Sequence, residues 1–210
     1  MARPVLPYEY RAARTLPLLF GAGLGAVVCA VPFVFSLEVD LGAAVLLAHL
    51  AAVLGGLGLG FVLDDPAATT TALCPSPWWL RRSLRIAGAL LVLAAAWSLG
   101  VVLVGRALQP GPELPYGDLA AESAALALLT VALALAGLRF TQGRGGGLVS
   151  ASALVVVVLT LVFLPSDVAL FSDPEDTARW EGAADRWRVL ALFALAGALA
   201  LLPVPPSPRR

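Results

Sequence analysis

The sequence predicts an all-α integral membrane protein with six transmembrane helices and both chain ends in the cytoplasm. The first observation is composition: 60% of the 210 residues are hydrophobic, which is more than a soluble domain can bury. The second is a set of six apolar runs that reach or approach the roughly 18 residues of a membrane-spanning helix. The runs are Leu16–Leu37, Leu41–Leu63, Ile86–Gly105, Leu119–Leu138, Leu148–Leu164 and Val189–Val204.

The charges of successive connections alternate in character, and this alternation sets the expected orientation. When the connections are assigned in turn to opposite sides, the side of the chain ends receives 10 of the 14 Arg but only 3 of the 14 acidic residues. Basic residues concentrate on the cytoplasmic loops of membrane proteins. We therefore expect a multi-pass protein of a bacterial inner (plasma) membrane. Its basic cytoplasmic rim suits anionic lipid headgroups.

Ahead of the first run, residues 1–15 are basic and contain two tyrosines and two prolines. They predict a short interfacial helix, although a disordered cytoplasmic tail explains them as well. Cys29 and Cys74 are expected at different depths, so both are predicted to be free thiols. No connection is long enough for a separate core, so residues 1–210 are predicted to form one transmembrane domain.

The second run holds two features that predict contact with other helices. Gly56-x-x-x-Gly60 is a small-residue pattern that lets helix backbones approach closely in lipid. His49 is the only histidine, and an ionisable residue inside a membrane is a functional hypothesis by default. No other His, Asp or Glu lies near it at metal-ligand spacing, so helix packing through a hydrogen bond is the favoured interpretation.

The cytoplasmic loop 64–85 between runs two and three predicts a short helix of its own. Asp65 is a good N-cap and Pro66 a good first helical residue. Pro75 disfavours helix in the residue before it, which leaves about two turns over Pro66–Leu73. Asp64 and Asp65 could also hold a divalent ion, but helix capping explains the pair more simply.

The extracytoplasmic loop 165–188 before the last run predicts an interfacial helical hairpin. Asp173-Pro174-Glu175-Asp176 is a helix-start signal with an acidic first turn. After it, Trp180, Ala184 and Trp187 share one helical face. The apolar residues before it, ending in Phe171, are expected to dip into the membrane.

Sequence motifs of known enzymes are absent, including H-E-x-x-H, G-x-S-x-G, the P-loop and C-x-x-C. We expect no catalytic residues, no metal site and no nucleic-acid partner, and the chain is not predicted to be an enzyme by itself. An intramembrane enzyme using His49 and Glu122 is the least favoured hypothesis, because we expect these residues at opposite ends of their spans or at different depths.

The layout resembles the membrane (permease) subunit of ABC-2-type ABC exporters, in a small actinobacterial form. The resemblance rests on the six runs, the two long connections, Leu63-Asp64-Asp65-Pro66-Ala67 and Trp78-Trp79-Leu80-Arg81-Arg82. It implies a partner, a cytoplasmic ATPase that binds ATP and Mg, and a second copy of the chain or a sister permease. The alternative is a non-transporting membrane scaffold or regulatory subunit. The ATPase-coupling residues that the resemblance implies are Asp64, Asp65, Pro66, Ala67, Ala68, Thr69, Thr70, Thr71, Ala72 and Leu73.

Overall fold

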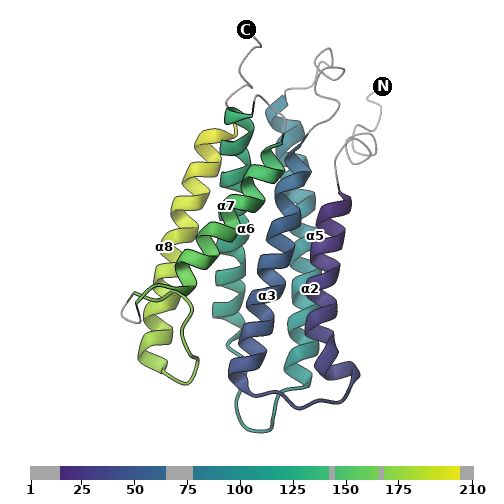
Figure 1. Cartoon of the computed structure of the whole chain (residues 1–210), viewed down its shortest axis with the longest axis vertical. Helices are drawn as coiled ribbons and strands as arrows, with labels where there is room; N and C mark the ends of the chain where they lie inside the picture. The colour runs from purple at the N-terminus through teal and green to yellow at the C-terminus, as the bar shows by residue number, and fades with distance from the viewer. Residues whose placement is uncertain (1–14, 65–77, 142–144, 166–167, 204–210) are drawn as a thin grey trace.

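The computed structural model describes residues 15–64, 78–141, 145–165 and 168–203, and these residues form a bundle of helices (Figure 1). One isolated pair of residues, Val39 and Leu108, joins the two connections at the lower end of the bundle in a parallel β-bridge. The helices are α2 (Leu16–Val34), α3 (Leu41–Leu59), the 3-10 turn η1 (Gly60–Leu63), α5 (Trp78–Arg106), α6 (Tyr116–Phe140), α7 (Gly146–Val162) and α8 (Thr177–Leu201).

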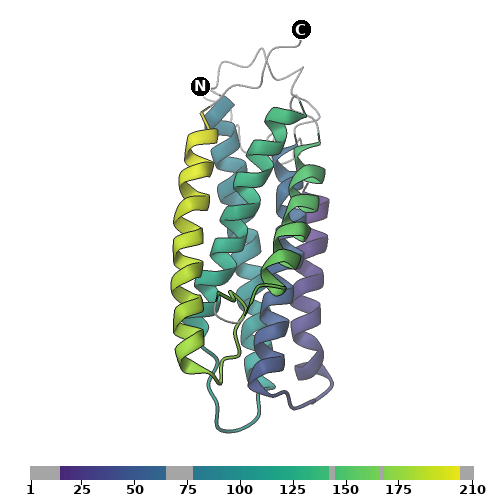
Figure 2. The ribbon, with the colours of Figure 1, turned by 60° about the vertical axis from the view of Figure 1, so that its left-hand side comes forward.

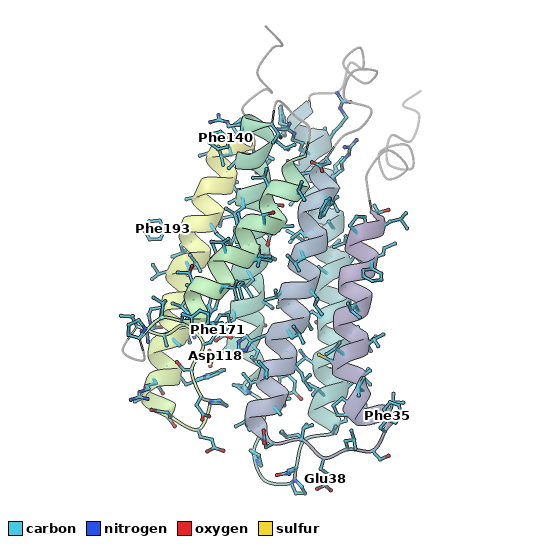
Figure 3. The ribbon with its side chains drawn as sticks, viewed as in Figure 1. Phe35, Glu38, Asp118, Phe140, Phe171 and Phe193 are labelled. Atoms are coloured by element: carbon cyan, nitrogen blue, oxygen red, sulfur yellow. The ribbon has the colours of Figure 1, made fainter. Side chains whose placement is uncertain are left out.

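Four segments are long and apolar enough to cross a membrane: Leu16–Val34, Leu41–Leu63, Trp79–Arg106 and Tyr116–Phe140. Large apolar side chains also cover the outside of the bundle. Phe140 and Phe193 point away from it (Figure 3) and are 86% and 73% exposed. Such a surface is typical of a helix bundle that faces lipid rather than water. The all-helical, membrane-type fold predicted from the sequence is therefore present.

The last two predicted spans take a different form from the first four. The fifth apolar run forms α7, an apolar helix of 17 residues. The sixth run is the second half of α8, and the first half of that helix carries the charged residues that follow Asp176.

Successive helices alternate in direction (Figure 1). Leu16, Trp78, Phe140 and Leu201 lie at one end of the bundle, which is the upper end in Figure 1. The opposite, lower end holds Val34, Leu41, Arg106, Tyr116 and Thr177. A consequence is that α3 and α6 run parallel, and both begin at the lower end.

The bundle consists of two groups of three helices. In the first, α2, α3 and α5 contact one another, and in the second, α6 contacts α7 and α8. Glycines permit the close approach within each group: a Cβ on Gly25 would lie 3.0 Å from the Cα of Ala51, and one on Gly137 would lie 3.1 Å from the Cβ of Val149. The two groups meet where α3 and η1 pack against α6 and α7. We call this boundary the seam.

The predicted interfacial hairpin is wrong in its described part. Residues 168–176 carry no helix, and they run from the lower end of α7 to the start of α8 (Figure 2). The helix begins later than its start signal predicts, because Asp176 rather than Asp173 is the N-cap: the Asp176 carboxylate accepts a hydrogen bond from Arg179 N at 3.2 Å, and the first helical residue is Thr177. Nothing after it stops the helix, however. No proline or glycine separates Trp187 from the last apolar run, so α8 continues as one helix to Leu201.

Three predictions concern residues outside the described ranges. They are the interfacial helix of residues 1–15 (except for its last residue, Thr15), the helix Pro66–Leu73 and the free thiol of Cys74.

Candidate functional site

His49 of α3 and Glu122 of α6 form a hydrogen-bonded pair across the seam, between Nε2 of the imidazole and Oε2 of the carboxyl group, and this pair is ionic when His49 is protonated. His49 lies eight residues after the start of α3 and Glu122 six residues after the start of α6. At 1.5 Å of rise per residue, these offsets correspond to about 12 Å and about 9 Å from the lower end. The two helices are parallel, so the depths match, and the expectation that these residues lie far apart was wrong.

This pair is buried among apolar side chains. The side chain of Glu122 is 2% exposed and that of His49 is 11% exposed. Beside the pair lie the buried residues Ala48 and Ala52 of α3 and Leu119, Ala125 and Leu126 of α6. A buried charge is tolerated only when it is paired and hydrogen-bonded, and removing one partner of such a pair typically costs about 3–5 kcal/mol. His49 and Glu122 therefore depend on each other.

Aromatic side chains cover the pair on the side of residues 168–176. The ring of Phe171 contacts the His49 ring edge-on, with centroids 4.9 Å apart and an interplanar angle of 85°. Phe171 in turn contacts Trp187 at 5.4 Å and 68°. The indole N–H of Trp187 donates to Leu170 O at 2.9 Å. Through these contacts, residues 168–176 pack against the His49–Glu122 pair on one side and against Trp187 of α8 on the other.

The placement of the two tryptophans corrects the sequence prediction. Trp180 and Trp187 were expected in the membrane interface, but they are 7% and 0% exposed and pack inside the protein. The physical reason is that both indole N–H groups find acceptors within the chain. Trp187 donates to Leu170 O, and Trp180 donates to Asp118 Oδ2 at 3.0 Å.

Below the pair, Asp118 joins α6 to α8 near the lower end. Its carboxylate accepts from Trp180 and also from Arg188 Nη2 at 3.1 Å, and Arg188 donates to Asp185 at 2.7 Å. In Figure 3, Asp118 and Phe171 both lie in the lower part of the bundle. A hollow of about 240 Å³ opens beside these groups. Its lining residues are Asp118, Glu181, Ala184, Asp185 and Arg188.

A second buried carboxylate lies at the upper end of the seam. Asp64 follows η1 and is 5% exposed, and its Oδ1 accepts a hydrogen bond from Gly147 N at 3.0 Å. Gly147 lies in the first turn of α7, where backbone N–H groups lack helical partners and the helix dipole favours a negative charge. Asp64 is the one predicted coupling residue within the described ranges. Asp65 to Leu73 lie outside them.

Both glycines of the predicted packing pattern lie on the seam. A Cβ on Gly56 would lie 3.0 Å from Leu154 of α7 and 3.2 Å from the Thr130 hydroxyl of α6. A Cβ on Gly60 would collide with Ser150 of α7. The pattern therefore identifies the close approach of α3 and η1 to α6 and α7, although the sequence did not name these partners.

These groups suit proton exchange better than other chemistry. No group of three or more His, Cys, Asp or Glu that could hold a metal ion occurs among the described residues. The imidazole and the carboxylate of the pair can each give or accept a proton. Sequence reasoning missed the pairing, and comparing the depths of His49 and Glu122 along parallel spans was the signal that could have found it.

The chain matches no protein-family model, no curated protein and no solved structure.

Proposed function

We propose that the chain is the membrane subunit of an ATP-driven exporter of the ABC-2 type. In this proposal six spans cross a plasma membrane, the upper end of the bundle faces the cytoplasm, and a separate ATPase docks on the loop after Asp64. ATP and Mg are bound by that ATPase, and a second copy of the chain or a sister permease completes the pathway.

The observation that carries the proposal is the attachment of Asp64. An exporter needs a mechanical connection between the ATPase and its spans, and the predicted coupling segment begins at Asp64. The Asp64 carboxylate is hydrogen-bonded to the start of α7, and η1 packs on the same helix. A displacement of the loop at this point would therefore move α3 and α7 together. A simple connection between two spans would not require such an attachment.

The distribution of charge supports the proposed orientation. Within the described ranges, the upper end carries four Arg, at positions 81, 82, 85 and 139, and one acid, Asp64. Acidic residues predominate at the lower end, from Glu38 through Asp185. Basic residues at the cytoplasmic surface are the expected arrangement.

The short α7 is compatible with a fifth span. Its 17 residues rise about 26 Å, slightly less than the roughly 30 Å of the hydrocarbon core. Residues 168–176, which have no helix, lie partly at membrane depth in this proposal. Irregular backbone is tolerated there when it is buried in protein, and the Phe171 and Trp187 contacts supply that burial.

Copurification tests the proposal. The tagged chain, expressed in its native membrane and purified in mild detergent, should bring down a P-loop ATPase. Ala68→Pro combined with Thr71→Gly should abolish that association or uncouple ATP hydrolysis from transport, because proline alone costs a helix about 3 kcal/mol. The matched control, Ala68→Leu with Thr71→Ala, keeps helix-forming residues at both positions and should retain the partner.

Two results would contradict the exporter proposal. One is a wild-type chain that brings down no ATPase. The other is a proline–glycine variant that behaves like its control in both association and coupling. Either result would favour the alternative, a membrane scaffold or regulatory subunit of a larger complex.

A further inference from the structure

Buried polar side chains gather on the seam between the two helix groups. Among the described residues, five polar or charged side chains are buried, and Arg85 on α5 is the one outside the seam. The other four are Asp64, Glu122, Thr130 and Ser150. Ionisable groups placed in this way inside a membrane protein commonly mark the path of an ion or a proton.

From the lower end, a polar route reaches the ion pair. The hollow beside Asp118 has a volume of about 240 Å³, which is room for several water molecules. Asp118 is 31% exposed and precedes Glu122 by four residues, so both lie on one face of α6 about 6 Å apart along its axis. Glu122 then contacts His49 directly. The exposed fraction of the side chain falls from 57% at Arg188 through 31% at Asp118 to 2% at Glu122.

Toward the upper end the route is closed. Ala52, Leu126 and Leu154 are buried in one apolar cluster, and Ala52 and Leu126 lie about one helical turn above His49 and Glu122 on their own helices. The next hydroxyls are engaged locally, since Thr130 donates to Leu126 O and Ser150 donates to Gly147 O. The described residues therefore place the pair one helical turn from Asp118 and the hollow, with apolar side chains between the pair and the upper end.

Few other titratable groups approach the pair. From α2, the Cys29 thiol donates to Leu47 O, two residues before His49. From α5, Trp97 donates to Ala48 O at 3.2 Å, and this indole does not titrate. α7 has no titratable side chain between Gly146 and Val162. The remaining charged neighbours on the route are Asp118 of α6 and Glu181, Asp185 and Arg188 of α8.

We propose that His49 and Glu122 form a proton-binding site that exchanges with the lower, extracytoplasmic side through Asp118. One proton is taken from a hydronium ion in the hollow, is passed by Asp118 to Glu122, and leaves a water molecule behind. Before uptake the pair is a neutral imidazole beside a carboxylate, with a net charge of −1. The added proton makes the pair net neutral and is shared between Nε2 and Oε2. Release follows the same route in reverse. The site takes its orientation from the proposed topology but requires no ATPase partner, so its test can fail while the exporter proposal holds.

The test is infrared difference spectroscopy on the purified full chain in proteoliposomes of known orientation. Bands of Glu122 are assigned as those lost in Glu122→Gln. A pH step on the lower side, with the pH on the other side clamped by an impermeant buffer, should change these bands. The same step on the upper side should not change them. Bands that follow the upper side, or that follow neither, would overturn the proposal.

Two variants locate the route. Asp118→Asn should slow the response to a lower-side pH step by about 100-fold, the contribution typical of a positioned acid–base group. Asp185→Asn is the matched control, because this carboxylate lines the same hollow but its side chain is 75% exposed. It should respond as fast as wild type. An unchanged rate in Asp118→Asn, or equal slowing in both variants, would overturn the route.

His49→Gln provides a second test in case the Glu122→Gln variant does not assemble. His49→Gln keeps a hydrogen-bond donor for Glu122 but removes the imidazole, so the response to lower-side pH should be lost. A full response in His49→Gln would show that the pair is not the binding site.

Discussion

The seam is joined at two levels by buried carboxylates with very different partners. At the upper level, Asp64 accepts a hydrogen bond from the backbone N–H of Gly147, which cannot titrate. At the lower level, Glu122 is paired with the side chain of His49, which can. We call these contacts the upper link and the lower link. The upper link can hold helices in place, but its backbone donor has no acid–base role. The lower link can hold helices in place and can also bind and release a proton.

The surroundings of the upper link and the lower link differ as well. The upper link is tied to backbone at a helix start, where Gly147 lies so close to Phe61 that a Cβ on it would be 2.7 Å from the Phe61 Cα. Aromatic rings cover the lower link, and a hollow lies one helical turn away. A fixed attachment suits the proposed transmission of force from the loop after Asp64, whereas a covered pair that can bind a proton suits the proposed proton site. The two levels of the seam therefore suit different tasks.

The largest expected effect comes from breaking the lower link on one side only. Glu122→Ala leaves His49 buried without its partner and should lower the free energy of unfolding by about 3–5 kcal/mol. Replacing both residues by leucine should restore most of this loss, because well-packed apolar residues often substitute for a buried ion pair at no net cost. An unfolding titration in mixed micelles measures the free energy of unfolding of the single variant and of the double variant. Equal losses in the single and double variants would mean that packing, rather than unpaired charge, explains the effect.

A smaller effect is expected from the upper link. Asp64→Ala removes one charged hydrogen bond and should cost about 1.5–3 kcal/mol. It should also speed amide hydrogen exchange over residues 145–150, because the Gly147 N–H loses its acceptor. Asp64→Asn is the control that retains a carbonyl oxygen and should lie between the alanine variant and wild type. Unchanged exchange in Asp64→Ala would remove the mechanical argument for the exporter proposal.

The smallest effect is expected from the aromatic cover. Phe171→Leu keeps most of the apolar volume but removes two edge-to-face contacts, each worth about 0.5–1.5 kcal/mol beyond burial. The lower link should survive, while the fluorescence of Trp187 should change as its ring contact is lost. Phe193→Leu, at a side chain that is 73% exposed, is the matched control and should leave both quantities unchanged. Loss of the His49–Glu122 contact in Phe171→Leu would mean that the cover holds the pair together.

The seam also explains why parts of the site escaped prediction. Counting from the predicted starts Leu41 and Leu119 places His49 about 12 Å and Glu122 about 4.5 Å from the lower end. The levels come close only because α6 begins three residues earlier, at Tyr116, which puts Glu122 at about 9 Å. Which helices are neighbours does not follow from counting, because six apolar helices can be arranged in many ways. The Gly56 and Gly60 pattern indicated a close approach but not its partners. Those partners are Thr130, Leu154 and Ser150, on two helices far along the chain.

The amino-acid sequence by itself determined the helical membrane-type fold, the beginnings of most helices and the separation of basic from acidic connections. These properties depend on local composition, on capping residues such as Asp40 and Asp176, and on the length of apolar runs. Only the tertiary structure decided that Trp180 and Trp187 face protein instead of the membrane interface, that α8 continues unbroken past Arg188, and that His49 meets Glu122. The physical reason is that a buried polar group is stable only beside a partner, and for these groups the partner lies on a distant segment that packing alone brings near.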